Sequence, residues 1–173
     1  PDEVNVALAS AGSTAQESSV APWSDGASSV INGQTTGDHS HTNQETNGWV
    51  QVDFGQNRSI HKVVIWNHGG NATNRNRLDG YRLDFYTGSN GSGSVVHTIS
   101  ENPGSSWTSN TSTLTASINC RSIRMVNEDY SQPQWTHIHE FQAFEADVYD
   151  EHLTQWQDKS GNAFHLTASS TAS

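Results

Sequence analysis

The feature that most constrains the fold is a series of short segments in which apolar and polar residues alternate with a period of two. The clearest are residues 49–54, 60–66 and 81–86, all rich in β-branched or aromatic side chains. Such alternation is typical of strands with one buried face. Weaker segments of the same kind follow at 95–99, 112–118, 121–127 and 138–146. Because no segment carries a helical apolar stripe longer than two turns, the sequence predicts an all-β chain.

The composition agrees with many short strands and long polar connections. Ser, Thr, Asn and Gly together make up 69 of the 173 residues, well above their usual share. Six Trp, five Phe and four Tyr still offer enough large apolar surface for one core. Trp49 and Trp66 lie inside strand patterns and are expected in that core. The predicted fold is an antiparallel β-sandwich or jelly roll.

Charge and cysteine content exclude several classes of protein. The formal net charge of −10 disfavours nucleic acid, which is bound mainly through Lys and Arg, and it equally disfavours an anionic membrane surface. A single cysteine, Cys120, cannot form an internal disulfide or a multi-cysteine zinc site. The start at Pro1, with no leader pattern, indicates a processed or excised piece.

The character of the chain changes after Asp147. Residues 148–173 are too few for a second core, although 163–166 are strand-like. We therefore predict one domain over residues 1–147. The segment 148–173 is either a linker or the truncated start of a following domain.

Several motifs resemble, in content and in order, those of discoidin-like domains, which include coagulation-factor C-type domains, galactose-binding carbohydrate modules and F-type (fucose-binding) lectins. The matching segments are 5–7, 28–33, 49–55, 60–65, 77–81 and 138–141. The resemblance covers about residues 4–147 and implies a discoidin-like jelly roll. The segment 155–162 resembles, more weakly, the start of a laminin-G or concanavalin-like domain.

The resemblance also implies a sugar pocket. F-type lectins hold fucose with a His, an Arg, an Asp and a second basic residue. Here His41 matches the first position, His68 stands in place of the Arg, Gly70 in place of the Asp, and Arg77 matches the second basic residue. The family's paired cysteines are missing from the 68–77 loop.

Galactose-binding relatives use a His, a basic residue, an Asn and an aromatic platform around the same rim. This chain can supply His41, Arg75 or Arg77, Asn74 or Asn76, and Trp135 or Tyr130. These types suit a sugar, whose hydroxyls need bidentate donors and acceptors and whose C–H face needs an aromatic ring. The alternatives are that Arg77 pairs with Asp79 or Asp84, and that Trp135 is an ordinary rim or core aromatic.

A structural calcium site is the second implication of the resemblance. Carried over residue by residue, Ser29 and Gln34 would contribute carbonyls, Asn32 and Asp38 side chains, His139 its carbonyl and Glu140 its carboxylate. Oxygen ligands of this mixture suit Ca²⁺. The ion would fix the loop that carries His39 and His41. The alternative is a loop closed by hydrogen bonds alone, with Glu140 capped or solvated.

Two other classes of function compete. Nine histidines raise the possibility of a metal enzyme, with His39, His41 and His68 as ligands or with His137 and His139 as a strand pair. No established catalytic motif accompanies them. A discoidin-type protein-adhesion domain is the other alternative.

The sequence as a whole predicts a non-catalytic, calcium-stabilised carbohydrate-binding module. Its expected partners are fucose- or galactose-containing glycans, with a sulfated polysaccharide as a further candidate. It would act without nucleic acid or membrane insertion, as a monomeric module of a larger secreted or cell-surface protein.

Overall fold

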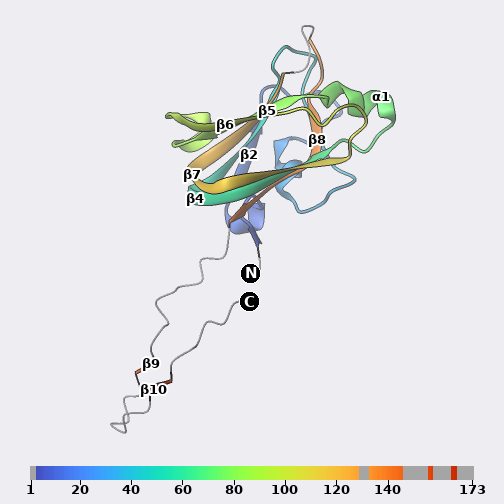
Figure 1. Cartoon of the computed structure of the whole chain (residues 1–173). Coiled ribbons are helices and arrows are strands. Elements are labelled where there is room, and N and C mark those ends of the chain that lie inside the picture. The colour runs from blue at the N-terminus through green and yellow to red at the C-terminus, as the bar shows by residue number, and fades with distance from the viewer. Residues whose placement is uncertain (1–2, 129–132, 146–155, 158–164, 167–173) are drawn as a thin grey trace.

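The computed structural model describes residues 3–128 and 133–145, together with the strand pairs at 156–157 and 165–166. Eight strands form one hydrogen-bonded antiparallel set in the order β1-β8-β4-β7-β5-β6, with β2 on β4 and β3 on β8 (Figure 1). The strands are β1 (Val4–Asn5), β2 (Thr14–Glu17), β3 (Ser40–His41), β4 (Trp49–Asn67), β5 (Tyr81–Tyr86), β6 (Val95–Glu101), β7 (Ser109–Asn127) and β8 (His137–Glu145). The predicted antiparallel sandwich of jelly-roll type is confirmed.

Two long strands, β4 and β7, connect the two halves of the sandwich. The first part of β4, up to Asp53, pairs with β2 and β7, whereas the part from Ile60 onward pairs with β7 and β8. Register shifts between Asp53 and Arg58 mark the change. The sequence predicted separate strands at 49–54 and 60–66, and the structure joins them into one irregular strand because the bend keeps both parts paired to β7.

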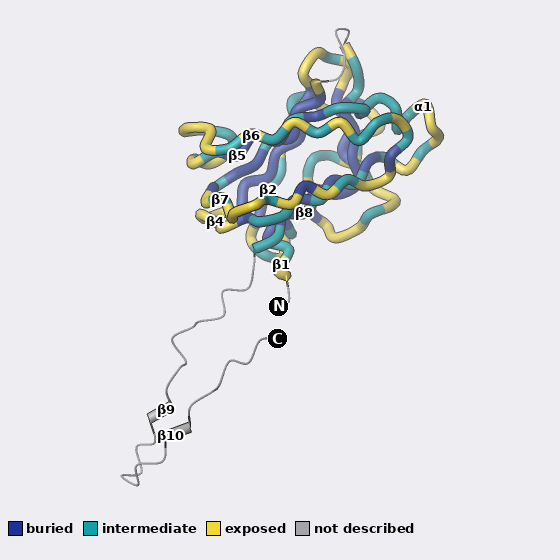
Figure 2. The backbone as a smooth tube through the Cα atoms, in the orientation of Figure 1, coloured by how far each residue is buried: buried dark blue, intermediate teal, exposed yellow. Residues whose placement is uncertain are grey.

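The core lies between the two halves, where Figure 2 shows the buried stretches of the long strands gathered. Its largest buried side chains include Phe54, Tyr81, Phe85 and Phe141. The expectation that Trp49 and Trp66 belong to the core is wrong, because both are only half-buried. Trp107 takes the place of a core tryptophan, and its indole N–H donates to the Leu78 carbonyl.

Short helical turns connect the strands. They are η1 (Ala9–Ala11), η2 (Ala27–Ile31), α1 (Ala72–Arg75), η3 (Asn76–Leu78) and η4 (Ser89–Gly91). Asn71 caps α1 by accepting a hydrogen bond from the Asn74 N–H at 3.0 Å, as Asn commonly does at this position. Within the described residues, no helix has the length and apolarity needed to cross a membrane.

The predicted domain boundary at 147/148 lies outside the described residues, and it stays a prediction. Beyond it, β9 (Trp156–Gln157) and β10 (His165–Leu166) pair with each other as a separate two-stranded antiparallel sheet. The suggested laminin-G-like start concerns the same region and also stays a prediction.

Candidate functional site

Strand pairing brings five histidines from three separate segments together at one end of the sandwich. His41 on β3 stands opposite His137 on β8. His137 and His139 share one face of β8, since side chains alternate along a strand. His68 follows the last residue of β4, which pairs with Ile138. His39, His41, His68, His137 and His139 are here called the imidazole cluster.

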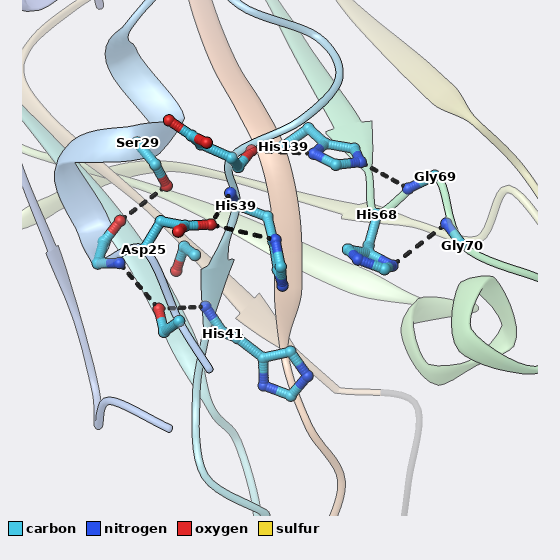
Figure 3. A network of polar contacts seen from close by, with 12 residues as sticks. Asp25, Ser29, His39, His41, His68, Gly69, Gly70 and His139 are labelled. Atoms are coloured by element: carbon cyan, nitrogen blue, oxygen red, sulfur yellow. Dashed lines mark hydrogen bonds and ion pairs between the residues drawn. The ribbon is translucent and has the colours of Figure 1, made fainter. Parts of the chain in front are cut away.

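The rings of the imidazole cluster are in direct contact. His68 is central, with ring centroids 4.4 Å from His39 and 4.8 Å from His137. It also stacks on His139 at 5.1 Å with an interplanar angle of 17°. The rings of His41 and His137 meet edge to face at 4.9 Å. Figure 3 shows His39, His41, His68 and His139 converging from different chain segments.

Burial keeps four rings of the imidazole cluster neutral. Loss of solvation lowers the pKa of His68 to about 4 and that of His137 to about 3. The same cause lowers the pKa values of His39 and His41. The neighbouring imidazoles lower all four pKa values further. The carbonyls bonded to His41 and His137 act in the opposite direction, as does the Asp25 carboxylate beside His39. These four rings are therefore neutral at pH 7, each with one N–H and one lone pair.

Hydrogen-bond partners assign the tautomers. His41 Nδ1 lies 2.8 Å from the Thr42 carbonyl oxygen and must donate to it, which leaves a lone pair on Nε2. His68 Nδ1 accepts from the Gly70 N–H at 3.2 Å, so its Nε2 carries the proton. The pocket lining thus includes both an acceptor and a donor, the combination that sugar hydroxyl groups need.

His139 plays a different part, because both of its nitrogens are engaged. Nδ1 donates to the Asp38 carbonyl at 3.0 Å, and Nε2 accepts from the Gly69 N–H at 2.7 Å. The ring thereby ties the loop before β3 to the loop after β4 (Figure 3). His139 is a structural bridge beneath the site.

A pocket of about 340 Å³ opens beside these rings, a volume at the lower end of the range for small-molecule sites. Among the described residues its lining includes no carboxylate. The lining residues are Trp23, His39, His41, His68, Asn74, Arg77, Trp135 and His137.

Four of the residues predicted to hold a sugar meet in this pocket: His41, His68, Arg77 and Trp135. The Arg77 guanidinium lies over the Trp135 ring at 4.4 Å, and the ion pairs among the described residues do not include Arg77. Arg75 lies apart, because its guanidinium donates to the carbonyls of Ser106 at 3.1 Å and Gly70 at 2.6 Å. Tyr130 lies outside the described residues.

The structure adds lining residues that the sequence did not assign to sugar binding. The sequence names His39 and His137 as candidate metal ligands. Asn74, by contrast, is already one of the two amide candidates for the sugar. Trp23 was not singled out at all, since its segment has no strand periodicity. The sequence signal for His137 was its two-residue spacing from His139, which places both on the same face of a strand.

The predicted calcium ligands include a buried carboxyl group, that of Glu140. Glu140 is fully buried, and its Oε1 accepts from the Gly33 N–H at 3.1 Å, while Oε2 has no hydrogen-bond partner among the described residues. Burial raises the pKa of Glu140 to about 8. Asn32 Oδ1 accepts from the Gln34 N–H at 2.7 Å and closes the turn above it. Ser29 is buried in η2, whereas Asp38 is exposed and its carbonyl accepts from His139.

The imidazole cluster does not form a metal centre. Among the described residues, no group of three or more His, Cys, Asp or Glu side chains is arranged to hold a metal ion. The alternative of a metal enzyme built on His39, His41 and His68 is therefore not supported. This finding does not bear on the predicted calcium site, because most of its ligands would be carbonyl and amide oxygens.

The sequence and the fold match a known class of protein. Residues 29–125, more than half of the chain, match the family of NedA-like galactose-binding domains in the coagulation factor 5/8 type C group. The chain belongs to this family, as its resemblance to discoidin-like domains predicted. No curated protein matches it.

Several solved structures with the same fold are described as lectin domains or carbohydrate-binding modules. A lectin domain of lectinolysin complexed with Lewis b is 23% identical, with a TM-score of 0.71 over 84% of this chain and 98% of that one. A Streptococcus pneumoniae fucose-binding module is 16% identical, with a TM-score of 0.69 over 83% and 98%. The family 32 carbohydrate-binding module from C. perfringens NanJ, in complex with galactose, is 18% identical, with a TM-score of 0.65 over 83% and 100%.

Proposed function

We propose that the protein is a non-catalytic carbohydrate-binding module whose pocket holds a terminal sugar of the fucose or galactose type. The observation that carries this proposal is a set of hydrogen-bonding groups in the pocket that no other described residue uses. His41 offers an acceptor, His68 a donor, and Arg77 a guanidinium fork within one cavity. Vicinal hydroxyls are matched by such a set. The sugars named for the structurally similar modules support the same choice.

A shallow, open pocket for one sugar predicts weak binding, with a Kd of order 10⁻⁴ M or about −5.5 kcal/mol. The proposal includes a larger secreted or cell-surface parent protein in which several modules raise avidity. A sulfated glycan is a second candidate ligand, favoured by Arg77 and by the absence of carboxylates from the described lining.

Titration calorimetry with methyl fucoside, methyl galactoside and a sulfated galactan tests the proposal. His41→Ala removes the acceptor at Nε2 and should weaken binding of the recognised sugar at least tenfold, in line with a hydrogen bond of about 1.5 kcal/mol. His97→Ala is the matched control, because that imidazole packs against Phe85 away from the pocket. If His41→Ala binds as tightly as the parent, the site assignment fails; if no sugar binds and a protein ligand does, adhesion is the function.

We further propose that calcium stabilises the loop at residues 29–38. The fit of the site is supported by the fully buried Glu140, whose Oε2 has no partner in the described part of the chain, because a buried carboxylate oxygen normally meets a donor or a cation. Glu140 would supply the charged ligand, with Asn32, Asp38 and the carbonyls of Ser29, Gln34 and His139 completing the shell. The ion would hold these oxygens together and fix the loop that carries His39.

Calcium should therefore raise the melting temperature, and chelation should lower it. A ligand present at one hundred times its Kd stabilises the folded state by about 2.7 kcal/mol. Glu140→Gln preserves shape and removes the charge, so this variant should lose the calcium-induced shift. An equal shift in the parent and in Glu140→Gln would place any calcium elsewhere.

A further inference from the structure

Trp23 is the aromatic residue that the site leaves uncovered. It lines the pocket and is 58% exposed, and it is the one aromatic side chain among the exposed large hydrophobic residues of the described chain. By contrast, His41 and His137 in the same lining are 5% and 1% exposed. The buried imidazoles form the floor of the pocket, and Trp23 forms its outer rim.

The loop that carries Trp23 is fixed to the strand that carries His41. The Ala21 N–H donates to the His41 carbonyl at 2.9 Å, and the Asp25 N–H donates to the His39 carbonyl at 3.0 Å. Ser24 Oγ accepts from the His41 N–H at 2.9 Å. These bonds flank Trp23 on both sides along the chain, so its position relative to the imidazole floor is set before any ligand arrives.

The two tryptophans of the pocket differ in what covers their rings. One face of Trp135 is occupied by the Arg77 guanidinium at 4.4 Å, and this residue is half-buried. Trp23 meets His41 edge to face, at 5.6 Å and an interplanar angle of 84°, and is far more exposed. A sugar's C–H face needs an open aromatic face. Trp135 therefore positions Arg77, and Trp23 is the more open platform.

We propose that Trp23 forms a second subsite, which stacks on the pyranose ring attached to the terminal sugar, so that the module recognises a disaccharide end. The proposal rests on the proposed function, because the first sugar must occupy the imidazole floor. A ligand confined to that floor would leave the indole exposed. A second ring that continues outward from the floor would cover it, and a rigid aromatic platform loses little conformational entropy on binding.

The test compares two monosaccharide and disaccharide pairs by titration calorimetry: methyl fucoside with a fucosyl-galactose disaccharide, and methyl galactoside with lactose. The variants are Trp23→Ala, Trp23→Tyr, which keeps a ring, and Val20→Ala. Val20 is a matched control, since it lies on the same loop and is 59% exposed without lining the pocket. Thermal melts check that each variant is folded.

For the pair that binds, the parent should prefer the disaccharide about fivefold, as expected for one aromatic contact. Trp23→Ala should bind the disaccharide no more tightly than the monosaccharide, while Trp23→Tyr and Val20→Ala should behave as the parent. An unchanged preference in Trp23→Ala, an equal loss for both sugars, or no preference in the parent would each overturn the subsite and leave the proposed function intact. Absence of all sugar binding by the parent would overturn both.

Discussion

Two regions of the molecule place an arginine over a tryptophan ring at almost the same distance, but they differ in how many other partners the arginine has. Arg77 lies 4.4 Å above Trp135 at the pocket, and Arg124 lies 4.3 Å above Trp49 on the outer face of the sheet. Arg124 also donates from Nε and Nη2 to Gln51 Oε1, at 3.0 and 2.8 Å. The Arg77 guanidinium makes no corresponding hydrogen bond to another described residue.

The outer-face arginine is also covered by the chain. The turn η4 passes over it so closely that a Cβ on Gly91 would lie 2.3 Å from both Arg124 Nη2 and Gln51 Oε1. Gly91 also has a φ of +68°, which glycine adopts without strain. Residue type and stacking alone therefore do not identify a binding site. A binding site is identified by hydrogen-bonding groups that other described residues do not use and that remain accessible.

The largest expected difference between the two arginines is in the free energy of unfolding. Arg124→Ala should lower the free energy of unfolding by about 2 kcal/mol, because it removes a stacked cation and leaves the buried Gln51 oxygen without a donor. Urea denaturation measures the loss, and sugar affinity should stay at the parent value. A stability change below about 0.5 kcal/mol would show that Arg124 is as dispensable to the fold as an open surface residue.

Arg77→Ala should give the opposite result. Its guanidinium faces the pocket, so its removal should weaken sugar binding between tenfold and one-hundredfold, as expected for hydrogen bonds to a charged group of about 1.5–3 kcal/mol. The free energy of unfolding should change by less than about 0.5 kcal/mol. Calorimetry measures the sugar affinity and urea denaturation measures the free energy of unfolding of the same sample. A variant that lost mainly stability would show that Arg77 serves the fold, as Arg124 does.

A smaller effect is expected when the supporting ring is removed. Trp135→Ala should weaken sugar binding about threefold, because a cation over an exposed ring is worth about 0.5–1 kcal/mol. In the double variant with Arg77→Ala, the second substitution should add almost nothing. Full additivity would mean that Trp135 contacts the sugar by itself, as the sequence had suggested.

The smallest effect concerns Cys120, which lies in the closed part of the fold. It is 1% exposed, and burial raises the pKa of its thiol to about 12. The thiolate is the reactive form, so native protein should show no labelling by iodoacetamide at pH 8, whereas protein in urea should be labelled fully. Rapid labelling of the native protein would show that β7 opens locally.

Sequence patterns identified the strands whose residues alternate clearly, such as 81–86, and the prediction for β5 matches the observed strand. They divided β4 into two strands, because the bend in it interrupts the alternation. They missed β3, since two residues cannot show a period. They placed Trp49 in the core, because alternation shows that one face of a strand is buried but does not show that an arginine covers the other face. They missed Trp23, whose position depends on a hydrogen bond from the distant His41 N–H to Ser24 Oγ.

Strand β8 carries the pocket at one end and pairs with the N-terminal strand β1 at the other. His137 lines the pocket, whereas Glu145 pairs with Val4 of β1 at the far end. Eight residue steps along a strand span about 27 Å. The sugar pocket and the pairing that holds the N-terminal strand are therefore separated by the full length of β8, so a change at one end need not disturb the other.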